Sequence, residues 1–116
     1  MSRDPRLYLE DMADFCRKVL AYTEGMSLDD MLADSKTFDA VIRNLETTGE
    51  AAKNVPQRIR ERHPEIDWRR ISGFRDVAIH AYPNLDAEII WDIVQQRVPE
   101  LLQQLEHLLS TEYPGP

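Results

Sequence analysis

The segment from residue 90 to residue 108 constrains the fold most, because its apolar side chains recur every three or four residues. These positions are Ile90, Val94, Val98, Leu101, Leu105 and Leu108. Such spacing places them on one face of an α-helix and differs from the period of two that a half-buried strand requires. Pro99 lies inside the pattern and should kink the helix, because it cannot donate a backbone hydrogen bond to the carbonyl of Gln95. We therefore expect a long, proline-kinked C-terminal helix capped by Asp86.

Start and stop signals predict the other helices. The first begins at Asp4-Pro5 and ends near Gly25, because aspartate and proline favour helix starts and glycine favours helix ends. Its predicted inward face consists of Tyr8, Met12, Phe15, Val19 and Tyr22. Further segments are expected as a short turn capped by Ser27, a helix over residues 36–55, a short piece between Pro56 and Pro64, and a third long helix over residues 68–82 capped by Asp67. The pattern predicts an all-α fold, an up-and-down bundle of four to five helices.

Length and composition are typical of one globular domain. The chain has 116 residues, of which 42% are apolar and 30% charged, enough to bury a core. We expect residues 1–116 to form a single domain with a frayed tail over residues 112–116. No apolar run approaches the roughly 18 residues of a membrane span, and the N-terminus lacks the apolar stretch of a signal peptide. A single cysteine excludes an internal disulfide, which favours the cytoplasm.

The charge is unevenly distributed along the chain. A net charge of −7 argues at first sight against nucleic acid, which binds clustered positive charge. Residues 1–52 carry a net −5, residues 53–75 a net +4 and residues 76–116 a net −6, so half of the 14 cationic side chains lie in the middle segment. Two interpretations stay open for that segment: a solvated arginine face paired with neighbouring acids, or a local positive potential for an anionic partner.

Reactive side chains outside the third long helix have structural interpretations. Cys16 lies on an apolar helix face and should be a core residue. His63, at a predicted helix end, should interact with the helix dipole, and His107 should be solvated. No histidine has a second His or Cys ligand three or four residues later, and the four glycines are isolated, so we predict neither a metal site nor a P-loop.

Polar residues in the third long helix interrupt an apolar stretch. Asp76 and His80 are four residues apart, so the carboxylate can orient the imidazole and favour its protonated form. Arg75 and His80 are about 140° apart on a straight helix. They converge only through the length of the arginine, a local distortion or a second copy of the helix. The residues alone leave open a helix–helix interface of hydrogen-bonded polar groups or a reactive site.

The octet from Arg75 to Tyr82 matches R-x4-H-x-Y and resembles the motif of HEPN-domain ribonuclease toxins. It is most similar to the HepT-like branch, which is paired with MNT nucleotidyltransferase antitoxins. Further agreement comes from Gly49-Glu50-Ala51-Ala52, which resembles the GEAA element of that branch, from Trp68, and from Ile90-Trp91-Asp92-Ile93. The resemblance covers about residues 7–109. Many HEPN proteins carry Asn where this chain has Asp76.

The resemblance implies the HEPN fold and a metal-independent endoribonuclease that needs no cofactor and cleaves tRNA or mRNA. His80 would be the general acid/base, because histidine exchanges protons near neutral pH. Arg75 would hold the scissile phosphate with its planar fork, and Asp76 would orient His80. Arg69 and Arg70 would line the approach for RNA.

The resemblance also implies partners. The chain would be the toxin of a toxin–antitoxin pair and would form a homodimer, or a higher homo-oligomer, whose two motifs share one cleft. The MNT nucleotidyltransferase would neutralise it by transferring AMP to Tyr82. A function of another class stays open: a non-catalytic helical module that dimerises and binds a nucleotidyltransferase or a nucleotide.

Overall fold

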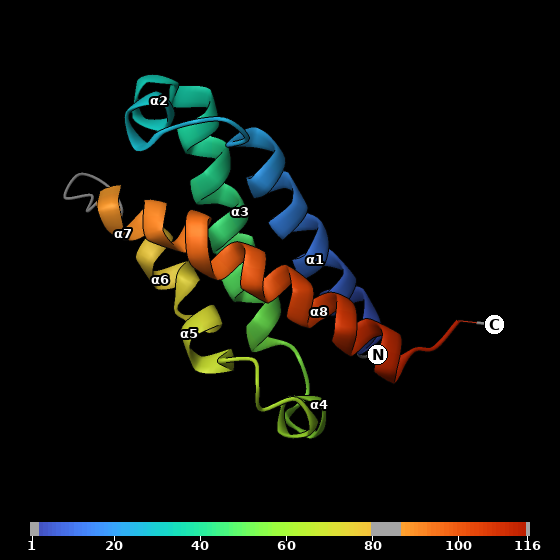
Figure 1. Ribbon diagram of the computed structural model, residues 1–116. Coiled ribbons are helices and arrows are strands. Elements are labelled where there is room, and N and C mark those ends of the chain that lie inside the picture. The colour runs from blue at the N-terminus through green and yellow to red at the C-terminus, as the bar shows by residue number, and fades with distance from the viewer. Residues whose placement is uncertain (1–2, 80–86, 116) are drawn as a thin grey trace.

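The computed structural model describes residues 3–79 and 87–115, and every regular element in these ranges is a helix (Figure 1). The elements are α1 (Pro5–Tyr22), α2 (Leu28–Ala33), α3 (Ser35–Lys53), α4 (Gln57–Arg62), α5 (Trp68–Ser72), α6 (Phe74–Ile79), α7 (Ala87–Asp92), the π-helical turn η1 (Ile93–Arg97) and α8 (Val98–Glu112). The predicted all-α fold is confirmed. No helix in the described part of the chain has the length and apolar character of a membrane span.

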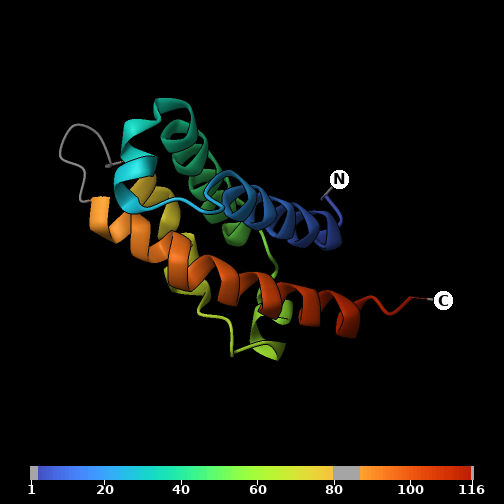
Figure 2. The same cartoon turned by 45° about the horizontal axis from the view of Figure 1, so that its top comes forward.

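Three long helices, α1, α3 and α8, form the body of the bundle. Helix α1 packs against both α3 and α8, while α3 also contacts α5 and α6. The short helices α2 and α4 lie at opposite ends of the bundle in both views (Figures 1 and 2). Helices α5 and α6 are therefore both packed against α3.

The predicted helix starts are confirmed where the structure describes them. The Asp4 side chain accepts a hydrogen bond from the backbone N–H of Arg6, and Asp67 caps α5 in the same way. Ser27 and Asp30 form a reciprocal capping box at α2, which satisfies two helix-end N–H groups at once. Asp86, the predicted cap of the last helix, lies outside the described residues.

The buried core confirms one apolar face and corrects another. All six apolar positions predicted between residues 90 and 108 are buried. The buried face of α1 instead consists of Leu9, Met12, Ala13, Cys16 and Val19. This face is rotated about the helix axis relative to the predicted one. Tyr8 and Phe15 therefore lie at the edge of the core, and Tyr22 is exposed. The aromatic rings of Tyr8 and Phe15 therefore mark the edge of the face, while its centre is formed by non-aromatic side chains.

Cys16 is a core residue, as predicted. Only 2% of its surface is exposed. Burial raises the pKa of its thiol to about 12, against a smaller opposing effect of the neighbouring Arg17 charge. Because the thiolate is the reactive form, Cys16 stays protonated and inert at neutral pH.

A π-helical turn accommodates Pro99 in the C-terminal helical segment. The turn η1 precedes α8, in which Pro99 is the second residue. The N–H of Val98 donates to the carbonyl of Ile93, five residues back instead of four. This wider turn relieves the clash between a proline ring and the carbonyl four residues earlier.

The third long helix is interrupted, which corrects the prediction of a continuous helix over residues 68–82. Helix α5 ends at Ser72, Gly73 follows, and α6 begins at Phe74. Glycine lacks a side chain and has a low helix propensity, so it permits this break. Residues 80–82 lie outside the described ranges.

The C-terminal end of α8 contacts the end of α4 and residues of the core. Glu112 is the last residue of α8, and its carboxylate lies 2.7 Å from Arg62 and 3.3 Å from the buried ring of His63. The hydrogen bond from Arg62 is the main reason why the pKa of Glu112 is lowered. Tyr113 packs against the core, and the Arg6 guanidinium lies over its ring. These contacts make His63 a structural residue at the end of α4, while the predicted fraying over residues 112–116 stays a prediction.

Candidate active site

Arg75 lies near the start of α6 and faces α3. Its Nε atom is 2.6 Å from Oε1 of Glu50, and Nη1 is 3.5 Å from Oδ1 of Asp76. The Nε atom is shielded from solvent and its N–H points off the line to the carboxylate, so the contact is a close ion pair rather than an aligned hydrogen bond. The Arg75 side chain is nevertheless 41% exposed. One edge of the guanidinium is therefore held by Glu50, while part of the group remains accessible to a ligand.

Gly49 brings the backbone of α3 against the junction of α5 and α6. A Cβ atom at this position would lie 2.5 Å from the backbone nitrogen of Arg75, 2.8 Å from the Arg75 Cβ and 3.0 Å from the carbonyl oxygen of Ser72. Only glycine allows so close an approach. The Gly49-Glu50 pair thus fixes both the backbone and the guanidinium of Arg75.

Asp76 is exposed and belongs to the same turn as Arg75. It lies beside the arginine as described above, which places a carboxylate on each side of that guanidinium. His80 and Tyr82 lie outside the described residues, so the predicted contact of Asp76 with His80 remains a prediction. The two carboxylates would orient the guanidinium and also compete with a phosphate for its charge.

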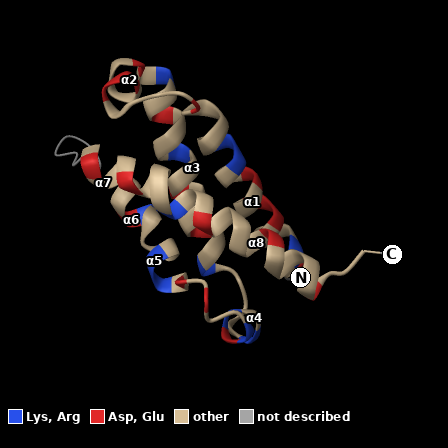
Figure 3. Cartoon of the chain, in the orientation of Figure 1, with Lys and Arg blue, Asp and Glu red and all other residues tan. Residues whose placement is uncertain are grey.

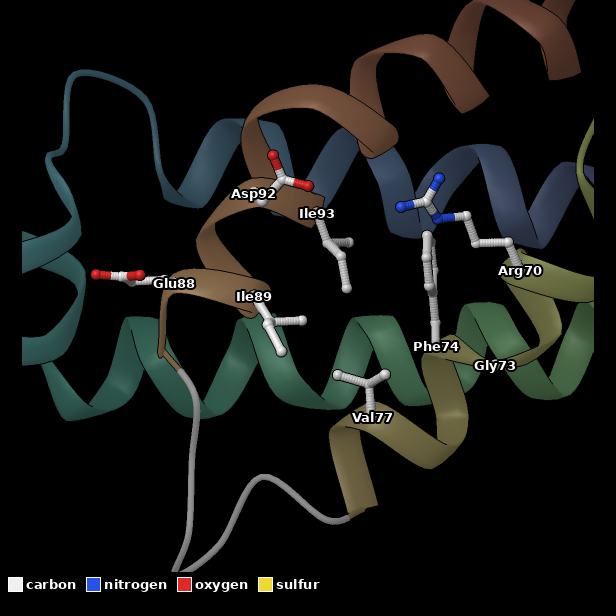
Figure 4. Close-up of a pocket in the computed structure, with 8 residues that line it drawn as sticks. All are labelled: Arg70, Gly73, Phe74, Val77, Glu88, Ile89, Asp92 and Ile93. Carbon is white, nitrogen blue, oxygen red and sulfur yellow. The ribbon is translucent and has the colours of Figure 1, made fainter.

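Arg69 and Arg70 are adjacent in sequence but line different pockets. Arg70 borders a pocket of about 660 Å³ between α5, α6 and α7, and Arg69 borders a pocket of about 680 Å³ between α4 and α5. In the first pocket, Val77 and Ile89 point toward one another (Figure 4). That pocket has acidic residues of α7 on its far wall, and Arg75 does not line it. The two arginines therefore do not form the single cationic approach that the sequence suggested.

The cationic segment is mostly unpaired in the described part of the chain. Of its seven basic side chains, only Arg62 and Arg75 have a carboxylate within 4.0 Å among the described residues. Figure 3 shows basic residues gathered over α4 and α5. The side chains without such a partner are Lys53, Arg58, Arg60, Arg69 and Arg70. The structure thus favours the interpretation of a local positive potential over that of arginines neutralised by neighbouring acids.

Glu50 is the site residue whose role the sequence did not reveal. The Gly49-Glu50 element matched a family pattern, but helical spacing within one segment cannot show a contact to Arg75, which lies 25 positions later. One signal was present: Gly49 lies between the apolar positions of a long amphipathic helix. A glycine on such a face indicates a close backbone approach.

The comparison with protein families places this helical fold in the HEPN-type class of small RNases. The family described as Ribonuclease HepT-like matches residues 12–108, and the chain belongs to this family. It is 41% identical over 93% of its length to "Probable ribonuclease HepT" of Thermococcus cleftensis, covering 98% of that protein.

Two further relatives show the same pattern. The chain is 36% identical to "Putative RNase TTE0752" of Caldanaerobacter subterraneus subsp. tengcongensis, covering 95% of this chain and 98% of that protein. It is 37% identical to "Putative RNase MJ0127" of Methanocaldococcus jannaschii, covering 93% of this chain and 89% of that protein. No solved structure matches the chain significantly.

Proposed function

We propose that this protein is a metal-independent endoribonuclease in which Arg75 and His80 act on the RNA backbone. The observation that carries the proposal is the partly exposed Arg75 guanidinium at the start of an R-x4-H-x-Y motif. Glu50 pairs with this guanidinium, and Gly49 allows α3 to approach the Arg75 backbone closely. The family match and the names of the relatives support RNA as the substrate class. Both tRNA and mRNA fit this chemistry.

The proposed reaction is an attack of the RNA 2′-hydroxyl on the adjacent phosphorus. The proton leaves the 2′-oxygen, the bond from phosphorus to the 5′-oxygen breaks, and that oxygen takes up a proton, giving a 2′,3′-cyclic phosphate and a 5′-hydroxyl end. His80 transfers protons, because an imidazole exchanges them near neutral pH. Arg75 stabilises the charge that develops on the non-bridging oxygens. Asp76 orients His80.

The active form is proposed to be a homodimer, in which two copies of the motif share a cleft. Arg75 and His80 diverge by about 140° on a straight helix, so a second copy offers each of them a partner. The open pocket between α6 and α7 supports this arrangement, since Val77 of α6, the helix that carries Arg75, and the half-exposed Ile89 of α7 give it apolar walls. Burying such walls is favourable on association.

Replacing His80 with alanine is expected to abolish RNA cleavage. The loss of a general acid/base lowers such rates by about 10²- to 10⁴-fold. Purified protein is incubated with single-stranded RNA in excess EDTA, and the products are separated on a denaturing gel. His107→Ala, which alters an exposed histidine of α8, is the matched control and should cleave normally. RNA left equally intact by the folded parent and by His80→Ala would reject the nuclease and favour the non-catalytic interaction module.

We further propose that Tyr82 is the regulatory site of this nuclease, as the toxin of a toxin–antitoxin pair. An MNT nucleotidyltransferase transfers AMP from ATP to the tyrosine hydroxyl and releases pyrophosphate, which adds bulk and negative charge beside the motif. Incubation with ATP, magnesium and a nucleotidyltransferase encoded next to this chain should add one or more AMP masses and suppress cleavage. Tyr82→Phe should add none, whereas the matched Tyr22→Phe variant, altered at an exposed tyrosine of α1, should be modified normally. Unchanged mass in the parent, or equal gain in Tyr82→Phe, would refute this role.

A further inference from the structure

The pocket between α4 and α5 has cationic walls that the site described above does not use. It has a volume of about 680 Å³, and Arg60 and Arg69 line it from the two helices. Neither arginine has a carboxylate within 4.0 Å among the described residues. Glu61 also lines the pocket, but its carboxylate accepts a hydrogen bond of 2.7 Å from Gln57. The pocket is therefore lined by two guanidinium groups against one carboxylate, which leaves its lining with a net positive charge.

Arg60 presents only part of its guanidinium to the pocket. Its Nε atom is shielded from solvent and has no hydrogen-bond partner among the described residues. An anion in the pocket would therefore bind through the terminal nitrogens of Arg60, which can donate to two phosphate oxygens.

The pocket adjoins the Arg75 site, because residues that line it lie close to Arg75 both in the sequence and in space. Ser72 lines its edge, and the Ser72 carbonyl and the Arg75 nitrogen both abut Gly49. Arg69 and Arg75 are six positions apart, on the adjoining helices α5 and α6. An extended strand with its scissile phosphate at Arg75 can therefore pass over Ser72 to Arg69 and Arg60.

The lining favours a nucleic-acid backbone over a protein partner. Protein interfaces centre on buried apolar and aromatic anchors, which need exposed apolar receptors. The large apolar side chains that line this pocket, Ile66 and Trp68, are already buried in the core. In the described ranges, the exposed large apolar side chains are Leu7, Tyr22, Leu32 and Ile89, and none of them lines it. Planar guanidinium forks match phosphate oxygens.

We propose that the α4–α5 pocket is an exosite that binds a phosphate of single-stranded RNA other than the one that is cleaved. This inference rests on the proposed function for its choice of RNA. The contact is independent of base sequence, because phosphate contacts position a strand without reading it. The exosite therefore raises affinity and sets the path of the RNA toward Arg75.

Binding of RNA by cleavage-deficient protein tests the exosite. The full-length His80→Ala protein is titrated into fluorescein-labelled single-stranded RNA, and anisotropy is measured at several KCl concentrations. Arg60→Gln and Arg69→Gln should each weaken binding by about fivefold and reduce the slope of log K against log salt by about 0.7. Arg60→Lys should recover most of the affinity, which separates charge from packing. Arg17→Gln, on α1 and paired with Asp14, is the charge-matched control and should bind as the parent does.

Cleavage kinetics and binding to a second polyanion, polyglutamate, distinguish an RNA exosite from the alternatives. In the cleavage-competent protein, Arg69→Gln should raise KM with little change in kcat, as expected for a contact remote from the reacting atoms. Unaltered affinity and salt slope in folded Arg60→Gln and Arg69→Gln would overturn the exosite, even if the parent cleaves RNA. Equal losses of binding to RNA and to polyglutamate would overturn its assignment to RNA. If the binding losses appear but the parent cleaves nothing, the exosite stands and the nuclease proposal fails.

Discussion

Replacing Gly49 with alanine is expected to lower the free energy of unfolding by about 1 to 3 kcal/mol, the usual cost of forcing an extra methyl group into a packed interior. The added Cβ would meet backbone atoms of Arg75 and Ser72 at 2.5 and 3.0 Å. Because these atoms are backbone, α6 must move away from α3 instead of a side chain rotating. The gain of about 1 kcal/mol from the helix propensity of alanine opposes this effect. Urea denaturation measures the difference.

The same substitution should also lower the rate of catalysis. A displacement of about 1 Å in a positioned group can reduce a rate by about 100-fold, and Arg75 lies directly at the clash. Gly73→Ala is the matched control: its nearest contact, the carbonyl of Arg70, is at 3.2 Å. With the propensity gain opposing this single contact, we expect a change under about 1 kcal/mol. Unfolding of Gly49→Ala at higher urea than the parent would show that propensity, not the close approach, governs this position.

Replacing Arg75 with alanine is expected to lower kcat/KM for RNA cleavage by about 10²- to 10³-fold, the usual cost of removing one donor that stabilises an oxyanion. Arg75→Lys should recover little of this loss. A lysine ammonium is a point charge and cannot contact Glu50 along one edge while presenting a fork to a phosphate on the other. Initial rates on a labelled RNA, measured in excess EDTA, give the comparison.

Glu50→Gln tests the role of the Glu50 charge separately from that of the Arg75 guanidinium. Glutamine keeps the shape and one acceptor oxygen of Glu50 but removes the charge, so Arg75 stays placed while its pairing weakens. We expect a smaller loss than with Arg75→Lys. Arg17→Lys, a conservative change at an exposed position of α1, should leave the rate unaltered. Cleavage by Arg75→Lys at the parental rate would show that charge alone suffices and would remove the geometric role assigned to the guanidinium.

Local signals in the sequence predicted most of the helices, because caps and apolar spacing act within a few residues. Asp4, Ser27 and Asp67 each cap the helix that their sequence context indicated. The break at Gly73 was not foreseen, since an isolated glycine is tolerated within many helices. Gly73 permits the break, and α3 approaches this junction at Gly49, a contact that nothing within residues 68–82 encodes.

The candidate site was predictable in its residue types but not in its contacts. Arg75 stood out because a polar group interrupted an apolar stretch. Its pairing with Glu50 joins two distant helices, and a single sequence holds no record of such pairs. The separation of Arg69 and Arg70 into two pockets follows from the rotation of about 100° per helical residue. Net charge alone would have hidden the exposed cations on α4 and α5.

The π-helical turn at residues 93–97 sets the rotation of α7 relative to α8, and so determines which residues of the two helices face the core. With one more residue in its turn than an α-helix would have, it lets Ile90 face the core and Ile89 face the pocket while Val98 and Leu101 keep the core register. Removing one residue from the turn would rotate α7 by about 100° relative to α8. The length of this segment, rather than its composition, therefore decides which side chains α7 presents opposite the helix of Arg75.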